Sequence, residues 1–503
     1  MEIMMKNIWF ISLCVLVLFY ACIDDDSTLP VKTISEISIK APSDTINIDF
    51  GFELIYDPEI EQTIEGKELS YEWCYHGYSK TSIGGMVKDS LKFLSNERIL
   101  RHSFKKLGEY RLRLKVTNEY GSTFKYFTLF VKAAFDQGIF VLSSDENKKG
   151  RVSFMRPLSR EEIEAGKEEF FYTSAFASVN PTYPLNDPTD VEKIGSDIFI
   201  ASRGDNLIYR MNAQTFELYN ITDFKTDLPW VKPIGICSKD RSITNYLVLS
   251  ENGGFASVNY KSDIAFLEED EFFEGNPKMD KMYVKVTGSP IPPATSVSKM
   301  RSYHFFLNYE KSTLYYFYDL YSYYARSKKF PDEELINVVM DKNTMSCLVS
   351  RSKTEPQKIT ITRGYASNKG PLENSWTYTY QADEMVTLTR KSLMQSNDTY
   401  NSVFYSNDNK LYRWYNWNAE PMLPKTPVVT LGSTCEITCF DFSQDGKELF
   451  LGVYDSGLSG LKGSVYVYDA DVLDPVTNEL KLLKKYEGIA DRPIKVFWKN
   501  NRK

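Results

Sequence analysis

The chain has 503 residues, of which 42% are hydrophobic and 25% charged, as in folded proteins with a large buried core. This length allows more than one domain. The formal net charge of −7 argues against nucleic acid as a partner, because phosphate binding requires clustered lysine and arginine. The high content of tyrosine (34) and phenylalanine (31) favours strands over helices.

Residues 1–21 have the pattern of a signal peptide. Lys6 supplies a positive charge, and an almost unbroken apolar run follows from Ile8 to Tyr20. That run is too short for a bilayer, which needs roughly 20 residues, and the small Ala21 stands at the cleavage point. Cys22 comes directly after it, which resembles the lipobox of bacterial lipoproteins. The resemblance implies that Cys22 is acylated and anchors the protein to a membrane; the alternative is ordinary secretion.

Residues 22–36 are expected to form an acidic tether. Asp24, Asp25 and Asp26 follow the cysteine and resemble the surface-export signal of lipoproteins from the Bacteroidota. This resemblance implies a position on the outer face of the outer membrane. The alternative is that the three aspartates are only a solvated spacer.

Residues 37–133 are predicted to form a small β-sandwich. Apolar residues alternate at Tyr110, Leu112, Leu114 and Val116, the period of a half-buried strand, and a turn signal at 118–121 separates it from a second strand at 124–131. The segments that resemble a polycystic-kidney-disease (PKD) type, immunoglobulin-like domain are 70–73, 102–104, 108–110 and 116–122. Trp73 is expected to fill the core between the sheets, and the resemblance implies a spacer or adhesive role.

Residues 134–503 contain a repeated hairpin pattern. The predicted pairs are 138–143 with 151–155, 197–202 with 207–212, 246–250 with 255–260, 303–308 with 314–319, 345–350 with 358–363, 401–406 with 410–415, and 447–453 with 464–469. Intervals of about 50 residues are near the repeat length of propeller blades. We therefore predict an all-β protein in which the sandwich is followed by a seven-bladed β-propeller; the alternative is a sandwich with irregular insertions.

Two local motifs refine this prediction. Residues 443–450 resemble the Ser-x-Asp-Gly-Lys-x-Leu-aromatic signature of propeller blades, with the Asp445-Gly446 pair at a tight turn. Ser159 and Glu162 fit a capping box, which predicts a short helix within an insertion.

The cysteines and histidines predict neither a disulfide framework nor a metal site. Cys435 and Cys439 lie in a predicted strand, which separates their Cα atoms by about 13 Å, whereas a disulfide allows at most about 7 Å. We expect no bond between them unless the segment turns. The three histidines stand at no ligand spacing to a cysteine, so no metal or other cofactor is expected.

Sequence motifs of known enzyme classes are absent. The chain has no Gly-x-Ser-x-Gly, His-Glu-x-x-His or phosphate-binding Gly-Lys motif. Carboxylates are clustered at 268–271 and 332–334, where a glycosidase pair is conceivable, but both segments resemble solvated loops. We therefore expect a non-catalytic protein; the alternative is a propeller-type hydrolase or lyase.

Aromatic side chains are the candidates for ligand binding. Trp414 and Trp417 stand within four residues of each other beside Arg413 and Asn416, and Trp376 precedes them in the chain. Tyr323 and Tyr324 follow a predicted strand. Flat apolar faces with adjacent hydrogen-bonding groups suit a glycan or peptide, so these five residues are the predicted binding site. The alternative is packing between blades.

As a whole, the chain resembles the PKD-like family lipoproteins of the Bacteroidota. The anchor motif, the PKD-like domain and the propeller-like region carry this resemblance. Such lipoproteins tend to be encoded beside starch-utilisation-type outer-membrane transporters. The resemblance implies an accessory role in nutrient uptake, in which the protein binds a glycan or peptide or docks on the transporter; a purely structural subunit of that assembly is a further alternative.

Overall fold

The computed structural model describes residues 34–500 with gaps. The gaps are 51, 67, 81–85, 89, 105, 227, 239–244, 252–254, 260–264, 268–303, 310–311, 318–324, 341–344, 368–369, 383–387 and 421. The chain divides into two units, Met1–Lys132 and Ala133–Lys503, one residue from the boundary that the sequence predicts. Cys22, Asp24, Asp25 and Asp26 lie outside the described residues.

Unit 1 is an immunoglobulin-like β-sandwich. Its strands are β1 (Ile37–Lys40), β2 (Thr45–Asp49), β3 (Leu54–Tyr56), β4 (Glu59–Gln62), β5 (Ser70–Lys80), β6 (Met86–Lys88), β7 (Lys92–Ser95), β8 (Leu100–His102), β9 (Gly108–Asn118) and β10 (Gly121–Lys132). One sheet has the order β2-β10-β9-β5-β6 with β7 also on β5, and smaller sheets pair β1 with β4 and β3 with β8. The predicted turn at 118–121 joins β9 to β10, where the side-chain oxygen of Asn118 accepts hydrogen bonds from the backbone N–H groups of Tyr120 and Gly121.

The core of unit 1 forms around Trp73, as predicted. Trp73 is fully buried and lies against Phe127 and Tyr56, with ring centroids 6.0 and 6.1 Å away. Its indole N–H donates to the carbonyl of Arg98 at 3.3 Å. Alternate residues of β9 point inward, which explains the period-2 pattern in the sequence.

Unit 2 is a β-propeller whose described part contains seven sheets, which confirms the predicted blade number. Blade 1 is β36 (Arg492–Lys499), β11 (Gly138–Ser144) and β12 (Gly150–Met155); blade 2 is β13 (Pro188–Ile194), β14 (Asp197–Ser202), β15 (Leu207–Asn212) and β16 (Leu218–Asp223); blade 3 is β17 (Pro233–Ser238), β18 (Asn245–Ser250), β19 (Phe255–Asn259) and β20 (Ala265–Leu267). Blade 4 is β21 (His304–Asn308), β22 (Thr313–Phe317) and β23 (Ala325–Lys329); blade 5 is β24 (Glu333–Met340), β25 (Met345–Ser352), β26 (Lys358–Ser367) and β27 (Gly370–Gln381). Blade 6 is β28 (Met394–Asn397), β29 (Ser402–Asn407), β30 (Lys410–Tyr415) and β31 (Val429–Thr430); blade 7 is β32 (Cys435–Phe442), β33 (Glu448–Asp455), β34 (Gly463–Leu473) and β35 (Leu480–Ala490).

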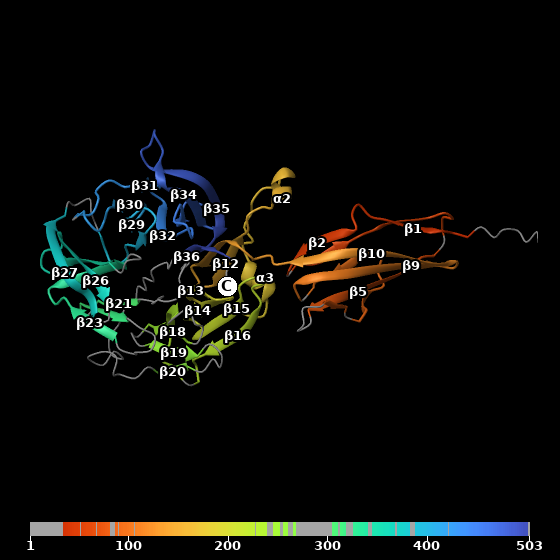
Figure 1. The fold of residues 1–503 in the computed structure, drawn as a ribbon, viewed down its shortest axis with the longest axis horizontal. Coiled ribbons are helices and arrows are strands. Elements are labelled where there is room, and N and C mark those ends of the chain that lie inside the picture. Colours follow the sequence, from red (N-terminus) through yellow and green to blue (C-terminus); the bar gives the residue numbers. More distant parts are fainter. Residues whose placement is uncertain are drawn as a thin grey trace, which may run out of the picture. The chain divides into compact units, whose positions relative to one another are not determined.

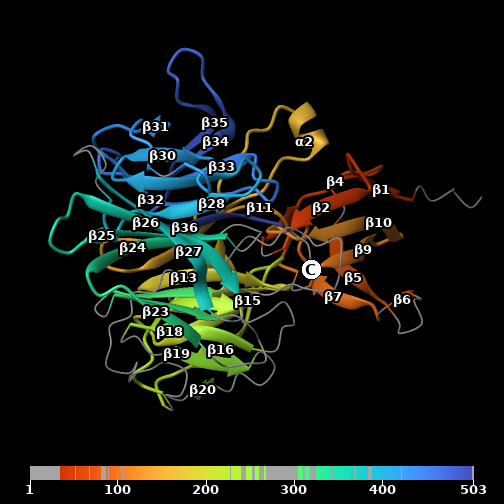
Figure 2. The same cartoon turned by 60° about the vertical axis from the view of Figure 1, so that its left-hand side comes forward.

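The propeller is closed by the two ends of unit 2. In Figure 1 the colours of this unit pass around a ring from gold through green and cyan to blue, and the last strand returns to the first. β36 pairs with β11, so blade 1 takes its innermost strand from the end of the chain. The first strands of neighbouring blades contact one another at β13–β17, β24–β28, β32–β36 and β36–β13, and these strands therefore surround the axis (Figures 1 and 2).

The hydrophobic core of unit 2 lies between blades. Blades 1 and 2 pack through Phe140, Phe154, Ile198 and Tyr209, and the other clusters repeat this arrangement around the ring. All six residues of β14 are buried, because a middle strand has a neighbouring blade on each face. A single blade cannot cover both of its faces, and stacking around the axis does so.

A β-bulge recurs in the innermost strand of five blades. The inserted residues are Ile494, Thr189, Ile234, Ile336 and Thr438 of blades 1, 2, 3, 5 and 7. A bulge bends the strand and redirects the side chains beside it. The residues that follow the bulges in blades 1 and 2, Lys495 and Asp190, form an ion pair.

The described helices are short. α2 (Arg160–Glu164) begins with the predicted capping box: Ser159 N–H donates to the Glu162 carboxylate at 3.0 Å, and Glu162 N–H donates to the Ser159 hydroxyl at 3.3 Å. α3 (Ala175–Val179) packs on blade 1. No helix in the described part of the chain is long and apolar enough to cross a membrane. Cys435 and Cys439 are both free and lie along β32.

Candidate functional site

Contrary to the prediction from the sequence, Trp414 and Trp417 do not offer their ring faces to a glycan or peptide. Each side chain is only 1% exposed, and both belong to the hydrophobic cluster between blades 5 and 6. Trp414 points inward from β30, and Trp417 folds back after the strand so that the two rings lie 6.4 Å apart in an edge-to-face contact. Their faces are therefore covered by protein. Tyr323 and Tyr324 lie outside the described residues.

Trp376 is the predicted binding residue that the structure leaves accessible. It is 43% exposed on β27, the outermost strand of blade 5. Of the six tryptophans in the described ranges, Trp376 alone is exposed. Packing in the sandwich core or between blades explains the other five side chains but not this one.

Trp376 belongs to a row of aromatic side chains along β27. Residues two apart on a strand share a face at about 7 Å spacing, so Trp376, Tyr378 and Tyr380 form one row, named here the aromatic row. Tyr378 is 38% exposed, and its ring centroid lies 5.8 Å from that of Tyr380. Tyr380 is half-buried, and its hydroxyl accepts the N–H of Leu423 at 3.2 Å. The row therefore begins at the exposed indole of Trp376 and ends at the phenol of Tyr380, which is fixed by its hydrogen bond to Leu423.

Polar groups lie next to Trp376 in β27, but on the opposite face of the strand from the aromatic row. Ser375 precedes Trp376, and its hydroxyl receives a hydrogen bond from the Lys328 ammonium at 2.8 Å. That ammonium also donates to the carbonyl of Leu372 at 3.3 Å. The exposed faces of the aromatic row can stack on an apolar ring face of a ligand.

A second group of functional side chains lies on the innermost strands. The Lys495 ammonium on β36 is 2.9 Å from the Asp190 carboxylate and 3.3 Å from that of Glu192, both on β13. The other oxygen of Asp190 accepts the backbone N–H of Ile236 in blade 3 at 2.9 Å. Asp441 on β32 accepts from the Gln395 side chain in blade 6 at 2.7 Å. We call these five side chains the axial cluster: Asp190, Glu192, Gln395, Asp441 and Lys495.

The axial cluster is enclosed by protein and still reached by solvent. Desolvation raises the pKa of Glu192 and of Asp441, whereas about a third of the Lys495 and Glu192 side chains is accessible. Three carboxylates and one ammonium make the cluster acidic. Within the described residues, no three histidine, cysteine or carboxylate side chains are grouped so as to hold a metal ion.

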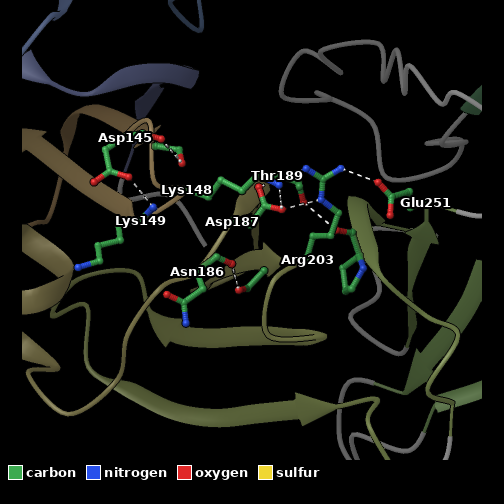
Figure 3. Close-up of polar contacts among 11 residues, drawn as sticks. Asp145, Lys148, Lys149, Asn186, Asp187, Thr189, Arg203 and Glu251 are labelled. Atoms are coloured by element: carbon green, nitrogen blue, oxygen red, sulfur yellow. Dashed lines mark hydrogen bonds and ion pairs between the residues drawn. The ribbon is translucent and has the colours of Figure 1, made fainter.

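Ion pairs continue from the axis to one face of the propeller. The start of β13 pairs with the end of β14, so the segment before β13 and the β14–β15 turn share this face. Figure 3 shows Arg203 between Asp187 and Glu251, at 2.8 Å from each carboxylate. Lys148 of blade 1 lies 3.5 Å from Asp187. These alternating charges tie blades 1, 2 and 3 together and leave no unpaired charge among them.

The acidic residues that the sequence suggested for catalysis lie outside the described residues or at the start of a strand. Residues 268–271 lie outside the described part of the chain. Glu333 and Glu334 begin β24 and so are not in a loop. Glu334 is ion-paired to Arg351 at 2.6 Å and to Arg390 at 2.9 Å. The structure thus places Glu334 in ion pairs with two arginines, whereas the axial carboxylates come from strands that have no recognisable sequence motif.

Comparison with known proteins supports the fold. No family model matches the chain, and no curated protein matches it in sequence. It is similar in structure to a quinonprotein alcohol dehydrogenase-like protein from Bacteroides thetaiotaomicron, with 15% identity, 91% of this chain and 97% of that chain covered, and a TM-score of 0.52. It is also similar to a proposed 6-phosphogluconolactonase from Bacteroides fragilis, with 12% identity, 73% and 99% covered, and a TM-score of 0.48. At such identities only the fold is shared.

Proposed function

We propose that this protein is a non-catalytic, lipid-anchored glycan-binding protein of the outer-membrane surface, accessory to a starch-utilisation-type nutrient uptake system. The observation that carries the proposal is the aromatic row, because it exposes Trp376 and Tyr378 on one face of an edge strand. Exposed aromatic rings cost solvation free energy unless a ligand covers them, and a sugar ring offers the matching flat apolar face. The proposed location on the outer-membrane surface rests on Cys22 and the aspartates at 24–26.

Binding to the aromatic row is tested with the full mature chain. Affinity electrophoresis and calorimetry against a set of neutral and acidic dietary and host polysaccharides should find one that binds. Trp376→Ala should weaken that binding at least tenfold, and the Trp376→Ala/Tyr378→Ala double variant should abolish it. The matched control is Tyr183→Ala, which removes an aromatic side chain of similar exposure (44%) elsewhere on unit 2. Equal binding by the double variant and the unaltered protein would refute the role of the row.

A peptide ligand or the transporter would give different results in the same series. A peptide that adds to the free edge of β27 as a strand would depend on its backbone and would tolerate loss of the two rings. Docking on the transporter would appear as co-purification from detergent extracts without any ligand.

The anchor is tested separately in cells. Cys22→Ala should prevent incorporation of labelled fatty acid and release the protein from the membrane fraction. Replacing Asp24, Asp25 and Asp26 with alanine should protect the protein from protease added to intact cells. Unchanged digestion of that variant would mean that the aspartates are only a spacer.

The axial cluster favours a second candidate function, a hydrolase or lyase acting on the same nutrient. Burial raises the pKa of two of its carboxylates, Glu192 and Asp441, as it does for general acids in active sites. Structural ion pairs produce the same shifts. Release of products from polysaccharide by the purified protein, lost in Glu192→Gln, would establish this function in place of simple binding.

A further inference from the structure

Arg363 is a buried cation that forms no ion pair in the described part of the chain; burial lowers its pKa, and the carboxylate of the exposed Glu420 raises it less strongly. It lies on β26 of blade 5 and is 3% exposed. One terminal N–H of its guanidinium donates to the backbone carbonyl of Glu420. Cys347 stands opposite it on β25, and the guanidinium is also hydrogen-bonded to this thiol. Burial raises the pKa of the Cys347 thiol to about 12, so the thiol is neutral at physiological pH and does not balance the charge.

Two hydrogen-bond donors have no acceptor where Arg363 meets blade 6. The guanidinium carbon lies 5.1 Å from the ring centroid of Trp414. Both the Nε–H of Arg363 and the indole N–H of Trp414 are buried without a hydrogen-bond partner. Five such buried atoms occur in the described part of the protein, and two of them belong to this single contact.

This arrangement is unfavourable unless an acceptor occupies it. A buried donor without a partner destabilises a protein, and a buried charge without a counter-ion does so more strongly. Unsatisfied groups in native proteins commonly mark a missing water or ion. A water molecule would satisfy the donors but leave the guanidinium with only the exposed Glu420 carboxylate to offset its charge, whereas a monovalent anion would satisfy the donors and neutralise the charge within the buried site.

We propose that a small monovalent anion, such as chloride or a carboxylate group, binds between blades 5 and 6 against Arg363 and Trp414. It accepts the two free N–H groups and neutralises the guanidinium. Arg363 is the cross-strand partner of Trp376 in the aromatic row, but its side chain is buried whereas that of Trp376 is exposed. The occupancy of the anion site does not depend on the function proposed above.

Thermal unfolding of the full mature chain tests the proposal at constant sodium concentration and pH. Chloride and acetate each replace gluconate, which is too large for an enclosed site. Tm should rise by roughly 2 °C or more with the concentration of at least one of the two small anions, because a ligand that binds only the folded state stabilises it. A response to chloride alone identifies an inorganic ion as the ligand, and a response to acetate identifies a carboxylate.

Two variants make the test specific. Arg363→Met removes the charge and should abolish the dependence of Tm on the anion. Arg351→Met is the matched control, since Arg351 lies in the same sheet but is already paired with Glu334, and this variant should keep the dependence. An equal anion response in Arg363→Met and the unaltered protein, or no response to either anion in the unaltered protein, would overturn the proposal.

If Arg363→Met does not fold, a crystal of the unaltered protein soaked in bromide tests the anion site instead. Bromide replaces chloride and scatters anomalously, so an anomalous peak beside Nε of Arg363 would support the site. Ordered water alone at that position would overturn it.

Discussion

Lys495 and Asp190 stand 305 residues apart in the sequence and form an ion pair of 2.9 Å at the axis of the propeller. The first belongs to the last strand of the chain and the second to the first strand of blade 2. The pair therefore joins the strand that closes the ring to the next blade. It adds a polar contact to the backbone pairing of β36 with β11.

Replacement of Lys495 by methionine should destabilise unit 2. The variant leaves the partly buried carboxylates of Asp190 and Glu192 without their cation. Because the Lys495 side chain is about a third exposed, we expect a loss of about 2 kcal/mol at pH 7, less than for a fully buried pair. Denaturant unfolding measures it. Lys485→Met, which breaks an exposed pair with Glu487, should cost less than 1 kcal/mol.

The loss of unfolding free energy in Lys495→Met should be smaller at acid pH. Desolvation already raises the pKa of Glu192, and loss of the ammonium raises it further. A carboxyl whose folded-state pKa lies above its unfolded value destabilises the fold when charged, and protonation relieves this as pH falls. The difference in unfolding free energy should therefore be smaller at pH 5 than at pH 7. A difference that stays constant over this range would contradict the assigned role of Glu192.

Lys499 should make the stability of the propeller depend on pH. It is 1% exposed at the end of β36, and its ammonium donates to the carbonyl of Asp136. Burial, together with the neighbouring Lys193, lowers the pKa of Lys499 from 10.5 to about 7. Between these two values the unfolded chain holds a proton that the folded protein has lost, so stability rises with pH across this window. Below pH 7 the penalty for the charged form is complete.

Lys499→Met removes this titration. Relative to the variant, the unaltered protein should gain on the order of 3 kcal/mol in unfolding free energy between pH 7 and pH 10. Urea unfolding at pH 7, 8.5 and 10 measures the gain. Parallel pH profiles for the two proteins would show that Lys499 keeps its ordinary pKa in the fold.

The sequence predicted the middle strands of the blades and missed their inner and outer strands, for a physical reason. β14 and β25 lie between neighbouring blades and read as apolar runs, so their hairpins were recognisable. β35 is mostly exposed and rich in lysine, and β13 is interrupted by a bulge at Thr189. Neither keeps the alternation that identifies a strand. The predicted seven blades followed from the hairpins alone.

The local sequence did not distinguish an exposed aromatic side chain from one that is buried between blades. Trp414 and Trp376 have similar neighbours in the chain, yet one is buried between blades and the other exposed on an edge strand. The difference depends on which face of the blade each occupies and on what the next blade covers. The axial cluster was missed for the same reason, since its members come from four blades and meet only when the ring closes.

The two tryptophans should therefore behave differently when truncated. Trp414→Ala opens a cavity in the cluster between blades 5 and 6 and should cost about 3–5 kcal/mol of stability. Trp376→Ala removes an exposed ring and should change stability by no more than about 0.5 kcal/mol. Denaturant midpoints of both variants check this. A large loss of stability in Trp376→Ala would mean that the aromatic row is part of the core and is not a ligand surface.

Gly463 should not tolerate alanine. A Cβ atom at this position would lie 1.8 Å from the carbonyl oxygen of Asp491 and 2.8 Å from that of Ala490, and these backbone atoms cannot rotate away. Gly463 begins β34 and pairs with Ala490, close to the point where β35 leads into β36. We expect Gly463→Ala to cost at least about 2 kcal/mol of unfolding free energy, because the strand must shift at the closing blade.

Gly432→Ala is the control. Its Cβ would meet only the Cys435 sulfur at 3.8 Å, which is an ordinary contact. Its unfolding free energy, measured from the denaturant midpoint, should stay within about 0.5 kcal/mol of that of the unaltered protein. Equal midpoints for the two variants would show that the backbone around Asp491 yields to a side chain, and that closure of the ring does not depend on the close approach at Gly463.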